Sequence, residues 1–164
     1  MYGEHGLRET QEDDMSGETD LIKLYSTKIL ALAADIPHQG RLEHADATVK
    51  RRSPLCGSTV TVDVALEGGK VARFAQDVKA CALGQASAAV VGAAIIGRST
   101  GEVETARDQL KAMLTEGGAV PDAPFEGLEV LIPAREFKNR HASIMLALEA
   151  TLEAMQTAQK ADCA

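Results

Sequence analysis

The segment from Thr59 to Val78, TVTVDVALEGGKVARFAQDV, has the pattern of a β-hairpin. Apolar residues alternate with other residues from Val60 to Leu66, which is typical of a half-buried strand. Two adjacent glycines follow, in Glu67-Gly68-Gly69-Lys70, and glycines accept the positive φ angles that tight hairpin turns need. The segment therefore predicts two antiparallel strands, the second running over Val71–Val78.

The flanking sequence predicts helices on both sides of this hairpin and one further strand before it. Residues 47–50 form the expected extra strand, and residues 82–96 are apolar on nearly all sides, as in a buried helix. Further helices are expected from Thr19 or Asp20 to Pro37, over 101–115 and over 137–159. This order predicts the α+β class, with a small three-stranded antiparallel sheet and helices packed on one face.

The chain has 164 residues and a formal charge of −7, which fits one domain. Residues 1–20 hold seven of the acidic residues and one arginine, so the rest of the chain is nearly balanced. We expect a disordered acidic leader at 1–18, a single domain at 19–160 and a tail at 161–164. A near-neutral domain gives no general basic surface for nucleic acid.

The apolar and cysteine content argues against a membrane protein and against a disulfide framework. The most apolar stretch, residues 88–97, is well short of the ~18 residues that span a bilayer. The leader does not resemble an export signal, and three cysteines are few and odd in number. We therefore expect a cytoplasmic protein with reduced thiols.

Two cysteines and one histidine stand at positions that suggest chemistry. Cys56 lies in a turn just before the hairpin, Cys81 lies where its second strand meets the buried helix, and His141 opens the last helix. Thiolate and imidazole ligands suit zinc or an iron–sulfur cluster. The wide spacing is unlike a C-x-x-C motif, so cysteines packed in the core and a hydrogen-bonded histidine remain alternatives.

Several segments, in order, resemble the IscU/NifU/SufU family of iron–sulfur cluster scaffolds. They are Leu24-Tyr25 opening a helix, Gly40-Arg41-Leu42-Glu43, Pro54-Leu55-Cys56-Gly57, the run from Cys81 to Ala88, and Arg140-His141-Ala142-Ser143. The similarity covers about residues 21–155, and the long separation between Cys81 and His141 is closest to the SufU branch. The resemblance implies a SufE/NifU-like fold, a cysteine desulfurase as partner, and apo iron–sulfur proteins as clients.

The sequence departs from the family pattern at two ligand positions. The family usually has an acidic residue two positions after its first cysteine, and here that residue is Ser58. The third cysteine corresponds to His141 in this alignment. The resemblance thus implies a site of Cys56, Cys81 and His141, with a fourth position open to water, a partner or Ser58.

Three functions follow from this site. The first is a non-enzymatic scaffold or accessory protein that holds a labile cluster or metal at the Cys56–Cys81–His141 site and transfers it to apo-proteins. The second is a zinc-dependent sulfurtransferase in which Cys56 accepts a persulfide from the desulfurase. The third is a degenerate adaptor that keeps the fold and the partner surface but has lost cluster chemistry, an alternative that the two departures keep open.

Overall fold

The computed structural model describes residues 25–163, and the leader predicted at 1–18 lies outside this range. The elements follow one another as helix, three strands, two helices, two 3-10 helices and a long final helix. In order they are α3 (Thr27–Ala34), β1 (Ala47–Arg52), β2 (Thr59–Glu67), β3 (Lys70–Lys79), α4 (Ala82–Ala94), α5 (Thr100–Thr115), η1 (Glu126–Glu136), η2 (Lys138–Arg140) and α6 (His141–Cys163).

The three strands form an antiparallel sheet in the order β1-β2-β3, as the sequence predicts. The hairpin between β2 and β3 turns at Gly68 and Gly69, whose φ angles of 61° and 78° suit residues without a Cβ. Val60, Val62 and Val64 are at most 1% exposed, so the alternation in the sequence does mark the face that is buried. The predicted α+β architecture is confirmed.

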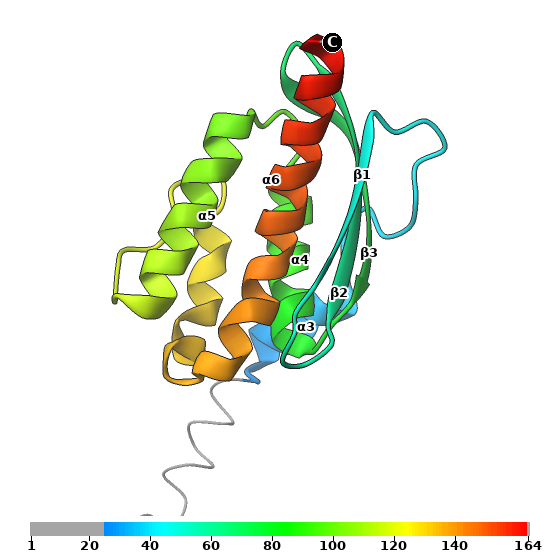
Figure 1. The fold of residues 1–164 in the computed structure, drawn as a ribbon. Helices are drawn as coiled ribbons and strands as arrows, with labels where there is room; N and C mark the ends of the chain where they lie inside the picture. The colour runs from blue at the N-terminus through cyan, green and yellow to red at the C-terminus, as the bar shows by residue number, and fades with distance from the viewer. Residues whose placement is uncertain (1–24, 164) are drawn as a thin grey trace, which may run out of the picture.

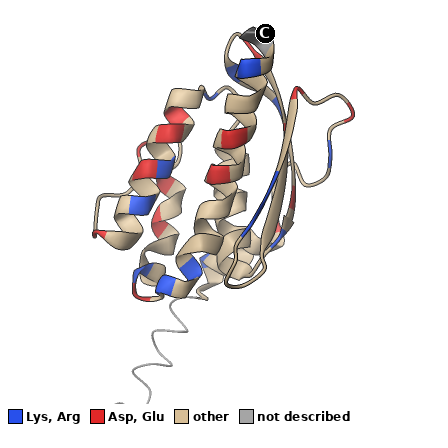
Figure 2. Ribbon diagram, in the orientation of Figure 1, with Lys and Arg blue, Asp and Glu red and all other residues tan. Residues whose placement is uncertain are grey.

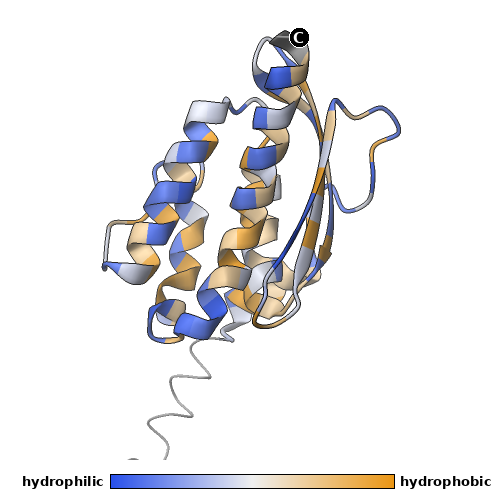
Figure 3. Ribbon diagram, in the orientation of Figure 1, coloured by the Kyte–Doolittle hydropathy of each residue, from blue (hydrophilic) through white to orange (hydrophobic). Residues whose placement is uncertain are grey.

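Helices α4, α5 and α6 lie on one side of the sheet (Figure 1). Their contacts bury a continuous core that includes Leu83, Leu110 and Leu148, each 0% exposed. Hydrophobic and hydrophilic residues both occur along α5 and α6 (Figure 3), as expected for helices with one buried face. None of the helices within residues 25–163 has the length and apolarity needed to cross a membrane.

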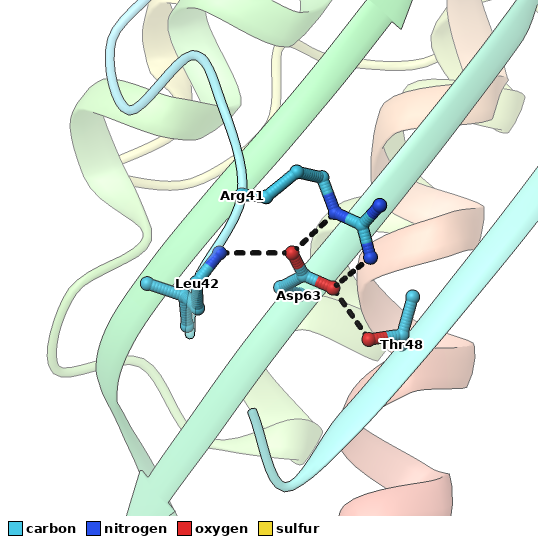
Figure 4. A network of polar contacts seen from close by, with 4 residues as sticks. All are labelled: Arg41, Leu42, Thr48 and Asp63. Carbon is cyan, nitrogen blue, oxygen red and sulfur yellow. Dashed lines mark hydrogen bonds and ion pairs between the residues drawn. The ribbon is translucent and has the colours of Figure 1, made fainter. Parts of the chain in front are cut away.

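The segment between α3 and β1, residues 35–46, is tied to the sheet by a buried carboxylate (Figure 4). Asp63 is 1% exposed and accepts hydrogen bonds from Arg41 Nε at 2.6 Å and from the Leu42 backbone N–H at 3.0 Å. The Thr48 hydroxyl is a further donor to the same carboxylate. We call residues 35–46 the strap, since this ion pair fastens them across the sheet.

Both ends of the free edge of β3 are occupied by other backbone. The Gln76 N–H donates to the His38 carbonyl of the strap at 2.9 Å, and Gly40 N–H donates to the Gln76 carbonyl at 2.9 Å. At the other end of the strand, Val71 exchanges hydrogen bonds with residues 97 and 98, between α4 and α5. The outer edge of β3 is therefore partly covered, at Val71 and at Gln76, without a fourth strand.

The helices differ from the sequence prediction at three places. Within the described residues the first helix begins at Thr27, because the Ser26 side chain caps it by accepting from the Ile29 N–H. Residues 126–136, which no helix was predicted to cover, form the 3-10 helix η1. The last helix is α-helical only from His141 and continues to Cys163.

Candidate functional site: two thiols joined by hydroxyl groups

Cys56 lies in the short loop between β1 and β2, residues 53–58. The loop is closed by hydrogen bonds from Ser53 N–H to the Ser58 carbonyl at 2.8 Å and from Gly57 N–H to the Ser53 carbonyl at 3.0 Å. Gly57 has a φ of 71°, a value that side-chain-bearing residues rarely adopt. Ser53 and Ser58 are buried, whereas the Cys56 side chain faces solvent. The hydrogen bonds of the loop therefore hold its backbone in place while the Cys56 thiol remains exposed.

Hydrogen bonds lower the pKa of the Cys56 thiol to about 7. The largest cause is the Ser53 hydroxyl, 3.4 Å from the sulfur, followed by the Ser58 hydroxyl at 3.1 Å and the Ser58 backbone N–H. These groups stabilise the thiolate, and burial is too slight to offset them. At neutral pH, about half of the Cys56 side chains are nucleophilic thiolate.

Cys81 directly precedes α4 as its N-cap residue, and its side chain is half-buried. Its sulfur lies 3.4 Å from the hydroxyl of Ser143, on the first turn of α6. The Ser143 hydroxyl in turn donates to the Ser58 hydroxyl at 3.1 Å. Cys81, Ser143, Ser58 and Cys56 thus form one continuous series of contacts, here called the hydroxyl chain.

The close approach of α4 and α6 positions Ser143. A Cβ added at Gly84 would lie 2.6 Å from the Ser143 Oγ and 2.9 Å from the Ala80 Cβ, so only glycine fits there without displacement. One turn further along α4, the Ser87 hydroxyl donates to the Ile144 carbonyl at 2.7 Å. These contacts fix the start of α6 against α4, next to the end of β3.

His141 is not part of the hydroxyl chain. Its Nε2 lies 2.9 Å from the Ala134 carbonyl oxygen and 3.1 Å from the Arg135 carbonyl oxygen, at the end of η1. In the part of the chain that the structure describes, no three His, Cys, Asp or Glu side chains are grouped so that they could hold a metal ion. The structure thus joins Cys56 and Cys81 through hydroxyls and does not join His141 to them, because η1 engages the imidazole.

The available donors do not fit a resident zinc ion. Zinc in proteins takes four ligands from thiolate, imidazole and carboxylate groups. The hydroxyl chain offers two thiols and two neutral hydroxyls, and a neutral hydroxyl is a poor ligand. We therefore derive no step through zinc at this site.

Sequence reasoning gave Ser58 a ligand position but overlooked Ser53 and Ser143. The signal for Ser143 is the spacing of small residues along α6: Ser143, Ala147, Ala150 and Ala154 recur at helical intervals, and all are buried. A polar residue at the start of such a stripe needs a buried hydrogen-bond partner. In this fold the Ser143 hydroxyl contacts the Ser58 hydroxyl and the Cys81 sulfur.

Positive charge lies near the exposed thiol. A Cβ on Gly57 would be 3.7 Å from the Arg52 Nη2, so this guanidinium lies beside the Cys56 loop. Basic residues also gather at the end of the molecule where α6 begins (Figure 2), including Lys138 and Arg140 of η2. An anionic group approaching Cys56 would meet a favourable field.

Comparisons with known proteins place the fold and the cysteines in one family. A sequence profile described as the NifU-like N terminal domain matches residues 24–130, a range that contains both Cys56 and Cys81 and ends before α6. A comparison with functionally curated proteins finds no match.

Solved structures agree with the profile. The N-terminal part of a nitrogen-fixing NifU-like protein from Brucella abortus is 38% identical, with a TM-score of 0.83, over 86% of this chain and 98% of that one. An iron–sulfur cluster assembly scaffold protein for the SUF system of Fervidobacterium islandicum has the same fold, with a TM-score of 0.73 at 21% identity, over 82% of this chain and 98% of that one. Since the profile covers more than half of the residues, the chain belongs to the NifU-like N-terminal domain family.

Proposed function

We propose that the chain is an accessory scaffold of iron–sulfur cluster assembly that accepts sulfur at Cys56 and delivers it to apo-proteins. The observation that supports this most directly is the exposed Cys56 thiol, whose pKa is lowered to about 7 by Ser53 and Ser58. Membership of a scaffold family supplies the context, and the hydroxyl chain supplies a second thiol at the same site.

Cys56 suits the acceptance of a persulfide from a cysteine desulfurase. Its thiolate attacks the terminal sulfur of the donor persulfide, a new S–S bond forms on Cys56, and the thiol of the donor leaves. A thiolate populated at neutral pH is the nucleophile of this exchange. The Ser53 and Ser58 hydroxyls hold its negative charge without a metal ion.

The surface around Cys56 fits a protein partner. The adjacent Leu55 is 74% exposed, an unusual degree of exposure for a large apolar side chain, and Arg52 lies beside the same loop. Docking of a desulfurase over this loop would cover Leu55 while the basic residues attract an acidic flexible segment.

An iron–sulfur cluster bound at this site is delivered to another protein and is not a resident cofactor of this chain. A [2Fe–2S] cluster takes four protein ligands, usually thiolates, and the hydroxyl chain contributes the thiols of Cys56 and Cys81. The remaining ligands have to come from the recipient protein or another thiol. A cluster held in this way is labile, which suits transfer.

Incubation of the full chain with a cysteine desulfurase and L-cysteine, followed by alkylation and peptide mapping, tests the proposal. We expect the mass of one added sulfur atom on the Cys56 peptide, and we expect Cys56→Ser to abolish acceptance. Cys163→Ser is the matched control and leaves acceptance unchanged. Absence of sulfur on Cys56 in the wild-type chain would overturn the proposal.

A further inference from the structure

The hydroxyl chain joins two thiols of different exposure. Cys56 is exposed, whereas Cys81 is half-buried and packs against the hydrophobic core. Ser58 is 5% exposed and Ser143 is 1% exposed, so the hydroxyls between the thiols are shielded from bulk water. A sulfur atom on Cys56 is open to soluble thiols, and a sulfur atom on the half-buried Cys81 is less accessible to them.

The hydrogen bonds of the chain all have the same direction. The Ser143 hydroxyl donates to Ser58, and each serine hydroxyl has only one proton. Ser143 therefore accepts a hydrogen bond from the Cys81 S–H. The Ser58 hydroxyl then donates its own proton to the Cys56 sulfur. The three hydrogen bonds form a path along which a proton on Cys81 can reach Cys56.

We propose that the site is an internal sulfur relay, in which a persulfide formed on Cys56 passes its outer sulfur to Cys81. This inference rests on the proposed function for the first persulfide. The Cys81 sulfur bonds to the outer sulfur, and the bond between that sulfur and Cys56 breaks, its electron pair staying on Cys56. The Cys81 proton moves through Ser143 and Ser58 to the Cys56 sulfur. Thiol and persulfide exchange places, so neither an oxidant nor a reductant is consumed.

In this reaction Ser143 carries the proton and contacts the Cys81 sulfur directly. The Gly84 contact places its hydroxyl on the path, and no carboxylate or imidazole interrupts the hydroxyl chain. Neutral serines suit a relay better than anionic ligands, since a nearby carboxylate would repel the thiolate that leaves Cys56.

A time course of sulfur location tests the relay in the Cys163→Ser background. The full chain is loaded by a cysteine desulfurase and L-cysteine, freed of both, alkylated at intervals and mapped by mass spectrometry. We expect sulfur first on the Cys56 peptide and then on the Cys81 peptide. Cys81→Ser retains sulfur on Cys56 and loses it faster to added glutathione.

Ser143→Ala should slow the transfer to Cys81 about tenfold, the effect of losing one hydrogen bond in the reaction path, while loading of Cys56 continues. Thr151→Val is the matched control, because it removes a buried hydroxyl of the same helix, α6, that makes no hydrogen bond to the described residues. It should leave the transfer rate unchanged. Melting curves of both variants check that each remains folded.

The failures are distinguishable. No sulfur on Cys56 would overturn the proposed function together with the relay. Sulfur that stays on Cys56, or a Cys56–Cys81 disulfide with release of sulfide, would overturn the relay and leave sulfur acceptance standing. Equal transfer rates in Ser143→Ala and Thr151→Val would overturn the proton path through the hydroxyls.

Discussion

Removing the Ser58 hydroxyl should lower the fraction of Cys56 that is thiolate at pH 7, and with it the rate at which Cys56 is alkylated. With a pKa of about 7, half of the Cys56 thiol is ionised at pH 7, against about 1% at the ordinary value near 9. The gain in thiolate is about 50-fold, and the lower basicity reduces the reactivity of each thiolate about eightfold. Cys56 should therefore be alkylated about sixfold faster at pH 7 than an unperturbed thiol.

Ser58 is one of the donors that hold this thiolate, with its hydroxyl 3.1 Å from the sulfur. Ser58→Ala should raise the pKa of Cys56 to about 8, because hydrogen bonds to charged groups are worth about one pKa unit or more. The assay is the rate of iodoacetamide alkylation at Cys56 between about pH 5.5 and 10, a range that brackets the expected midpoints near 7 and 8. Peptide mapping assigns the rate to Cys56.

Thr151→Val, which removes a buried hydroxyl with no hydrogen-bond partner among the described residues, controls for the general effect of losing such a group. A wild-type midpoint near pH 9, the ordinary value used above, would refute the argument. So would a midpoint that is the same in Ser58→Ala and in the wild-type chain.

Three further substitutions test other parts of the structure. Gly84→Ala places a methyl group 2.6 Å from the Ser143 Oγ and should lower the free energy of unfolding by about 1–3 kcal/mol, measured in urea; an unchanged midpoint would contradict the close packing. Burial raises the pKa of Asp63, but hydrogen bonds, foremost from Arg41, outweigh it and hold the pKa below its ordinary value. The ionised Asp63 therefore stabilises the fold fully above its unfolded pKa of about 3.9, and this stability is lost as the pH falls through the lower folded pKa. Asp63→Asn should lower the free energy of unfolding by about 3 kcal/mol at pH 7. Melting curves of this variant should also depend less on acid pH than those of the wild-type chain. His141→Ala removes the imidazole that bonds to the end of η1 and should cost about 1 kcal/mol with unchanged metal content of the purified protein, whereas a loss of bound metal would support the ligand assignment.

The sheet could be predicted from the sequence because its signals are local. Alternation from Val60 to Leu66 and two glycines at the turn indicate the strands, the turn and the buried face within twenty residues, whereas nothing in this pattern indicates the register shift between Ala65 and Leu66. The helix η1 escaped prediction because Pro133 lies inside it, and proline normally argues against a helix. Its buried residues nonetheless recur at every third position, Leu128, Leu131 and Ala134, as a 3-10 helix requires.

The candidate site was predicted only in part because half of it depends on tertiary packing. The positions of Cys56 and Cys81 follow from the ends of the hairpin, which the sequence specifies. The contact between Ser143 and Ser58 joins residues 85 positions apart and exists because Gly84 lets α4 and α6 approach. The residues next to His141 in the sequence do not indicate that its ring lies against the carbonyl groups of Ala134 and Arg135 at the end of η1.

The covered edge of β3 has a consequence for the colloidal behaviour of the protein. An open strand edge is a template on which other chains add strands and begin to aggregate. The strap blocks this template at Gln76, and the ion pair between Arg41 and Asp63 keeps the strap in place. The opposite edge, β1, bears Lys50, Arg51 and Arg52, whose charge repels a second sheet. Conditions that neutralise Asp63 would therefore weaken the hold on the strap and open this edge to pairing with strands of other chains.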